Sequence, residues 1–167
     1  MSNKIVDGII KPIDWLRKTQ AGPAPSLDPK VILKDLAKDE TINRVRKSEF
    51  SLHNAYLGPA RDQKKIVTII QRGLIALDLM AVDRTKKYWW RKPIIDAGID
   101  GGFVWGSYGD QTSEAIKVLQ DLAGIDPKEG LEGQKFGFKT LTVLEAALKA
   151  KAAKMDWRAA VKKAAIK

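Results

Sequence analysis

Two stretches of the chain share one pattern of glycines, an aromatic residue and a threonine. They read GSYGDQTSEAIKVLQ, from Gly106 to Gln120, and GQKFGFKTLTVLEAAL, from Gly133 to Leu148. In each, an aromatic stands directly before a second glycine, a threonine follows three residues later, and an apolar helical pattern comes next. Glycine adopts positive φ without strain, and a threonine hydroxyl can accept from the free N–H groups that begin a helix. The pattern therefore predicts a tight turn that leads into a capped helix, used twice.

A further helix is predicted upstream of the two copies. From Asp62 onward, apolar residues recur at steps of three and four, which is the period of a helix that buries one face. The residues at these steps are Ile66, Ile69, Ile70, Leu74, Leu77 and Met80. Together with the two copies, this helix predicts a three-helix core and no strand between Ile66 and Leu148.

The rest of the chain divides where its composition changes. We expect residues 1–29 to form a docking arm with a proline-rich linker, residues 30–61 a short helical segment, and residues 62–148 the domain with the repeat. Residues 149–167 contain seven cations and one acid and no helix breaker, so a long basic helix is expected to continue the last copy. The predicted fold class is all-α.

Two shorter helices are expected within the second of these segments. Asp28 and Pro29 offer an N-cap followed by proline at the first helical position. A second helical stretch is expected from Glu40 toward Tyr56, because apolar residues recur along it.

Composition limits the possible partners and chemistry. The 167 residues include 30 Lys and Arg against 20 Asp and Glu, a net charge of +10 that favours an anionic partner. The absence of cysteine excludes disulfides, thiolate catalysis and a cysteine-type zinc site. No apolar run approaches the ~20 residues that span a bilayer, and charges interrupt the N-terminal segment where a signal peptide would need an apolar core. We therefore expect no transmembrane segment and no signal peptide.

The order of the repeated residues resembles the bacterial peptidoglycan-binding domain family, a small three-helix module with internal pseudo-repeats. The resemblance covers residues 62–148, about half of the chain. The positions that match the family's motif are Gln71 in the first helix, then Gly106, Gly109, Thr112 and Gln120, and finally Gly137 and Thr140. Trp105 departs from the pattern, since the motif has aspartate there, and one extra residue separates Gly133 from Gly137. The resemblance implies a murein-binding fold.

The segment KKYWWRK, residues 86–92, is the most unusual candidate for a binding surface. Aromatic faces stack on sugar rings, and cations pair with the lactyl and peptide carboxylates of murein. The predicted glycan-binding residues are Tyr88, Trp89, Trp90, Arg91, Trp105 and Tyr108. In a structural alternative, Trp89 and Trp90 close the ends of the helix bundle. Aromatics among cations also suit single-stranded nucleic acid, although no recognised nucleic-acid motif is present.

Signals for catalysis are weak. His53 is the only histidine, so a zinc peptidase site with several histidines is excluded, and no G-x-S-x-G elbow occurs. The acids Glu40, Glu49, Asp96 and Asp100 are available for a carboxylate pair, but they stand in no lysozyme-like signature. We expect no cofactor, no metal and no enzymatic activity; if the chain is an enzyme, peptidoglycan hydrolysis is its expected reaction.

These observations lead to one functional hypothesis with two alternatives. We expect noncatalytic binding of bacterial peptidoglycan by a component of a bacteriophage tail or baseplate, made in the host cytoplasm and acting at the periplasm. The N-terminal arm and the C-terminal helix would hold the chain to other virion proteins in an oligomeric assembly. An endolysin-type murein hydrolase is the first alternative, and a purely structural virion protein is the second.

Overall fold

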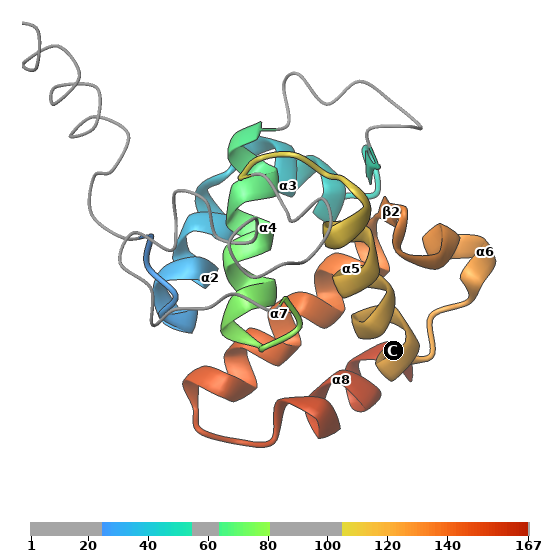
Figure 1. The fold of residues 1–167 in the computed structure, drawn as a ribbon. Helices are drawn as coiled ribbons and strands as arrows, with labels where there is room; N and C mark the ends of the chain where they lie inside the picture. The colour runs from blue at the N-terminus through green and yellow to red at the C-terminus, as the bar shows by residue number, and fades with distance from the viewer. Residues whose placement is uncertain (1–24, 55–63, 81–104, 167) are drawn as a thin grey trace, which may run out of the picture.

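The computed structural model of the chain describes residues 25–54, 64–80 and 105–166, and helices form most of them (Figure 1). The helices are α2 (Pro29–Lys38), α3 (Glu40–Arg46), α4 (Lys64–Ala76), α5 (Asp110–Ala123), α6 (Pro127–Gly130), the 3-10 helix η3 (Leu131–Gly133), α7 (Phe138–Ala152) and α8 (Trp157–Ile166). Two short strands, β1 (Leu52–His53) and β2 (Lys135–Phe136), complete the regular structure of these residues. The protein is mostly α-helical, which confirms the predicted class.

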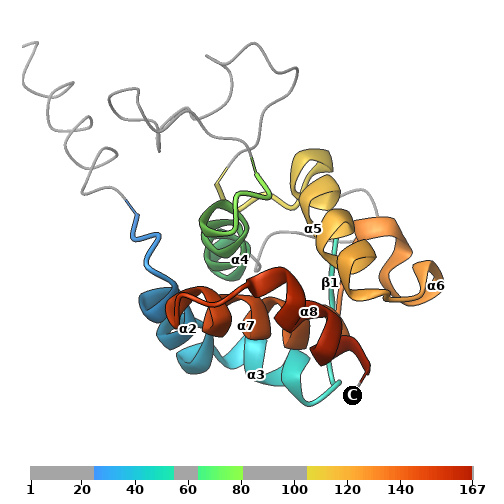
Figure 2. The same ribbon diagram turned by 90° about the horizontal axis from the view of Figure 1, so that it is seen from below.

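Helix α7 is the central element of the described structure. It contacts α2, α3, α5 and α8, while α4 packs against α2 and α5. Figure 2 shows α7 and α8 next to each other, with α4 above them in that view. The second copy of the repeat therefore supplies the helix around which the others pack.

Aspartates begin the first two described helices. The side chain of Asp28 accepts from the N–H of Lys30 at 2.9 Å, and Pro29 occupies the first turn, as the sequence predicts. Asp39 has extended backbone angles, which end α2, and its side chain accepts from the N–H of Ile42 at 3.0 Å. One aspartate thus separates two helices that would otherwise merge.

The helix predicted from Glu40 toward Tyr56 is wrong beyond Arg46, where α3 ends. Ser48 has a φ of 62°, a left-handed conformation that costs about 1–2 kcal/mol in a helix and cannot continue one. The chain then extends into β1 and does not complete further helical turns.

Strands β1 and β2 form a small antiparallel ribbon. Leu52 lies opposite Phe136, and His53 lies opposite Lys135. Because β2 falls within the repeat region, the prediction of no strand there is wrong. The ribbon forms where two segments cross the core side by side: Leu52 and Phe136 are fully buried, and backbone groups at such depth require partners.

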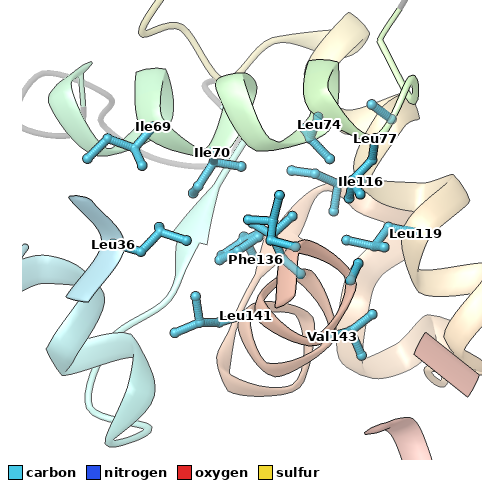
Figure 3. Packing of buried hydrophobic residues seen from close by; sticks show 14 of the residues in the cluster. Leu36, Ile69, Ile70, Leu74, Leu77, Ile116, Leu119, Phe136, Leu141 and Val143 are labelled. Carbon is cyan, nitrogen blue, oxygen red and sulfur yellow. The ribbon is translucent and has the colours of Figure 1, made fainter. Parts of the chain in front are cut away.

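Apolar side chains from most helices meet in one hydrophobic core. Figure 3 shows Phe136 among Leu36 of α2, Ile70 of α4, Ile116 of α5 and Leu141 of α7. Each of these five side chains is at most 1 % exposed. These residues come from before and within the two copies of the repeat, and Trp157 and Val161 add side chains from after them.

The helix predicted upstream of the repeat is confirmed as α4. All six of its predicted core positions are buried, but so are Val67, Gln71 and Ile75, so α4 is enclosed on more than the one face that the pattern predicts. The helix ends at Ala76, and the last two positions, Leu77 and Met80, reach the core from the residues that follow.

The long C-terminal helix predicted from the sequence is wrong, because the chain breaks into two helices. α7 ends at Ala152, Lys154 has a φ of 59°, and α8 begins at Trp157. The break turns α8 back against α5 and α7, where Trp157 and Val161 are buried. A straight helix would leave these side chains in water, at a cost of about 2 kcal/mol each. The sequence signal for this break is Asp156, directly before α8, whose side chain accepts from the N–H of Arg158 at 3.1 Å as an N-cap does.

The predicted boundaries at 61/62 and 148/149 do not separate independent cores. Ile32 and Val45 from the second segment lie in the same buried cluster as Leu74 and Leu144 of the repeat domain. Val161 of the last segment belongs to it as well. The docking arm predicted over residues 1–29 falls, up to residue 24, outside the described residues.

Candidate functional site

Gln71 joins three parts of the structure through one side chain. It is fully buried on α4, and its Nε2 donates to the carbonyl of Ser107 and to the hydroxyl of Thr112, both at 3.1 Å. Its Oε1 accepts from the N–H of Gly106 at 2.9 Å. A buried polar group without partners costs about 1–3 kcal/mol, so this set of bonds fixes the loop against both helices.

Gln120 makes the same set of bonds one helix later. It is buried on α5, and its Nε2 donates to the carbonyl of Lys135 at 2.9 Å and to the hydroxyl of Thr140 at 3.0 Å. Its Oε1 accepts from the N–H of Gly133 at 2.8 Å. In each case, a buried glutamine on the preceding helix binds the glycine turn and the threonine of the copy that follows it.

The backbone repeats together with the hydrogen bonds. Gly106 and Gly133 have φ values of +84° and +89°, a region that favours glycine. Gly109 and Gly137 are the N-caps of α5 and α7 and share extended angles, with φ of −103° and −115°. The predicted repeat of turn and helix is therefore confirmed, and the extra residue of the second copy lies in the stretch that contains β2.

The predicted role of the threonines is wrong. Neither α5 nor α7 has a side-chain cap, because a glycine occupies each N-cap position. Thr112 and Thr140 lie in the first helical turn, where their hydroxyls accept from the amides of Gln71 and Gln120. The reason is that a buried glutamine has two amide hydrogens to satisfy, and the loop carbonyl takes only one.

The predicted glycan-binding residues fall into separate groups. Tyr88, Trp89, Trp90 and Arg91 lie outside the described residues, so their part of the groove stays a prediction. Trp105 is half-buried and packs against the hydrophobic core. The structure therefore describes only the end of the predicted groove that adjoins the first copy.

Tyr108 is wrongly assigned to a glycan surface. Its side chain is 1 % exposed, and its hydroxyl donates to the carbonyl of Gly133 in the second copy. Burial raises the pKa of Tyr108 above its usual range. The ring cannot reach a sugar. The matching residue of the second copy, Phe136, is also fully buried. An aromatic residue at the same position of both copies is therefore a core position, and the alignment of the copies could have indicated this.

A hollow of about 600 Å³ lies beside the second copy, between the loop before β1 and the start of α7. Its lining includes two phenylalanines, Phe50 and Phe138, and three lysines, Lys128, Lys135 and Lys139. Phe138 is 45 % exposed, so part of its ring is available at the surface of the hollow. The hollow thus combines aromatic surface with positive charge.

An ion pair and a cation–π contact involve residues that line this hollow. Lys139 and Glu129 form an ion pair at 2.9 Å across its edge, and Glu49 also lines it. The guanidinium of Arg44 stacks over the ring of Phe50, 4.9 Å from its centre. Sequence reasoning missed this site because its two walls are distant in the chain, and the pairing of β1 with β2 brings them together.

The remaining candidates for chemistry are dispersed. Within residues 25–54, 64–80 and 105–166, no group of three or more His, Cys, Asp or Glu side chains is placed to hold a metal ion. In the same ranges, no helix has the length and apolar character needed to cross a membrane. His53 lies in β1 and Glu40 begins α3, whereas Asp96 and Asp100 fall outside the described residues. No protein family, curated protein or solved structure matches this chain.

Proposed function

We propose that this protein binds bacterial peptidoglycan without cleaving it, as a component of a bacteriophage tail or baseplate. The observation that carries the proposal is the duplicated glutamine bridge, made by Gln71 and by Gln120 with the same kinds of partner. These glutamines, with their glycines and threonines, are the residues on which the resemblance to the peptidoglycan-binding family depends.

The bridges support the resemblance because they give each motif residue a physical task. A chance match of glycines and threonines would not place Thr112 and Thr140 on equivalent buried glutamines. It would not give Gly106 and Gly133 the same left-handed conformation either. The motif therefore behaves as a structural unit used twice, as the family's pseudo-repeat implies.

The net charge of +10 supports an anionic polymer as the partner. Peptidoglycan carries carboxylates on its lactyl groups and stem peptides, and a positive surface raises the rate of encounter with such a polymer. The exposed side of α8 adds Arg158, Lys162 and Lys163 to this surface. We propose that this side of α8 and the N-terminal arm also contact the neighbouring virion proteins.

The test is co-sedimentation of the whole chain with purified bacterial sacculi. The whole chain is required because α2, α3 and α8 share the core with the repeat, so a fragment of residues 62–148 would lose its packing partners. We expect the protein to pellet with sacculi, to release no reducing sugar from them, and to prefer them to double-stranded DNA at physiological salt. Protein that stays in the supernatant would overturn the proposal and favour a purely structural role.

One double variant probes the predicted loop. If the Trp89→Ala/Trp90→Ala double variant pellets as well as the unchanged chain, the loop is not part of the binding surface. The proposal itself would stand in that case.

A murein hydrolase is the second candidate, and one observation favours it. Glu49 and Glu129 line the same hollow, as a pair of carboxylates would in a glycosidase. Glu129 is already engaged by Lys139, which leaves it poorly placed as a proton donor. Release of reducing sugar that is abolished by Glu49→Gln would establish the hydrolase and overturn noncatalytic binding.

A further inference from the structure

We propose that the hollow beside the second copy is the saccharide-binding site, and that it takes a carboxylated amino-sugar strand. This inference rests on the proposed function and names the surface that performs it. The residues that carry it are Phe50, Phe138, Lys128 and Lys135.

The walls of the hollow are held in place by backbone hydrogen bonds. On one side, the N–H of Ser48 donates to the carbonyl of Val45 at 3.0 Å, and the N–H of Glu49 donates to that of Arg44 at 2.8 Å. On the other side, the ribbon of β1 and β2 fixes the start of α7. The site is therefore preformed, which lowers the entropy lost when a ligand binds.

The lining chemistry matches a saccharide with acidic groups. Phe138 projects an exposed ring from the start of α7, and Phe50 forms part of the facing wall. Phe50 is half-buried against the core and carries Arg44 over its ring, so only the part of it that lines the hollow is open to a ligand. Sugar rings stack on aromatic faces, while Lys128 and Lys135 would pair with the carboxylates of the strand.

Polar groups in the lining suit the hydroxyl and amide groups of amino sugars. Ser48 and Ser51 line the same wall as Phe50 and offer hydroxyls that both donate and accept. A few polar groups among apolar surface are typical of sites that orient a small ligand. The hollow thus has a group for each part of a muramic acid residue: ring, carboxylate and amide.

The first copy lacks these features at its equivalent place, which is the start of α5 and the loop before it. Asp110 stands where the second copy has Phe138, and Ser107 stands where it has Lys135. The buried side chain of Asn54 packs beside the start of α5, and its Nδ2 donates to the hydroxyl of Ser113 at 2.7 Å. The negative charge of Asp110 would repel the carboxylates of such a strand, so this part of the first copy lacks the groups that form the proposed site.

The inference is tested with whole-chain variants in the sacculus assay. We expect Phe138→Ala and Lys135→Glu each to weaken binding by about tenfold, because each removes one of the few anchoring groups. Val118→Ala is the control for Phe138→Ala, since Val118 is 46 % exposed on α5 and lies away from the hollow. Lys34→Glu, at an exposed position of α2 away from the hollow, changes the net charge as Lys135→Glu does, and we expect both controls to bind like the unchanged chain.

A second measurement does not depend on sedimentation. Titration with a soluble disaccharide-peptide that contains N-acetylmuramic acid should shift the NMR amide signals of residues 135–139 and 48–51, and not those at the start of α5. If the unchanged chain binds sacculi and both hollow variants bind equally well, the hollow is not the site, although the proposed function survives. If the unchanged chain fails to bind sacculi, both proposals are overturned.

Discussion

The two copies of the glycine and threonine unit are alike inside and different outside. In both, a buried glutamine binds a glycine N–H, a loop carbonyl and a threonine hydroxyl. At the surface, the first copy has an acid at the start of its helix, engaged by Asn54, while the second has an exposed phenylalanine and lysines around a hollow. The buried hydrogen bonds thus specify the fold of the unit, whereas its surface residues vary between the copies and determine what each can contact.

The largest effect is expected from an alanine at the turn of the second copy. A Cβ on Gly133 would lie 2.0 Å from the carbonyl oxygen of Ser113, which is backbone and cannot move aside. A Cβ on Gly106 would lie 2.3 Å from the side-chain Cγ of Lys64 and 2.9 Å from its carbonyl oxygen, so its clash with backbone is less severe. We expect Gly133→Ala to lower the free energy of unfolding by about 4 kcal/mol and Gly106→Ala by about 2 kcal/mol, measured by urea denaturation.

Gly124→Ala is the control for these two variants. Gly124 also has a positive φ, of +72°, but a Cβ added there would meet no neighbouring atom within 4 Å. Gly124→Ala should lower the free energy of unfolding by about 1 kcal/mol, from backbone strain alone. Equal losses at Gly124 and Gly133 would show that the second turn is not crowded as described.

The next effect tests whether the two bridges are equivalent. Gln71→Leu and Gln120→Leu each remove three hydrogen bonds and leave buried partners unpaired, so each should cost about 3 kcal/mol in the free energy of unfolding. Gln134→Leu, at an exposed position, is the control and should cost less than about 0.5 kcal/mol. A difference between the two buried variants of more than about 2 kcal/mol would break the comparison of the copies.

A smaller effect is expected where the copies differ. Asn54→Ala removes the side-chain bonds to Ser113 and Asp110 and should cost about 1.5 kcal/mol. In a double-mutant cycle with Ser113→Ala, the coupling energy should be about 1 kcal/mol. A coupling energy near zero would mean that Asn54 does not hold the start of α5 in place.

The smallest effect concerns the bond between the copies and depends on pH. Tyr108→Phe removes the hydrogen bond to Gly133 and should cost about 1 kcal/mol at pH 7. Burial raises the pKa of the folded tyrosine above its unfolded value of about 10, so its contribution is complete below pH ~10 and is lost as the pH rises further. Above pH ~10, the unchanged chain loses about 1.4 kcal/mol of its free energy of unfolding per pH unit relative to Tyr108→Phe. The unchanged chain and the variant should therefore be nearly equal in stability by about pH 11. A stability difference that stays constant from pH 8 to about pH 11 would contradict the burial of this hydroxyl.

Sequence reasoning succeeded where the signal is local. The cap at Asp28, the helix α4 and the two glycine turns depend on residues a few positions apart, and all are confirmed. It failed for Thr112 and Thr140, since their partners Gln71 and Gln120 lie one helix away. Local patterns thus predicted which residues matter, and the packing of the helices showed why.

The candidate site was less accessible to sequence reasoning than the fold. An aromatic residue beside cations can face solvent or the core, and Tyr108, predicted to bind a glycan, is buried. Phe138, which lines the hollow, stands at the start of a helix, and no pattern in the sequence indicates that its side chain is exposed. Exposure is decided by what packs on a residue, and that information lies elsewhere in the chain.

The helical class, the positive charge and the duplicated turn are predictable from the amino-acid sequence, because they follow from spacing, composition and the conformational freedom of glycine. The folded chain is needed to show that α8 packs back on α7, that β1 pairs with β2, and that a hollow with aromatic and cationic lining lies beside the second copy. These features depend on contacts between distant segments, whose free energies come from burial and buried hydrogen bonds and not from any local preference of the chain.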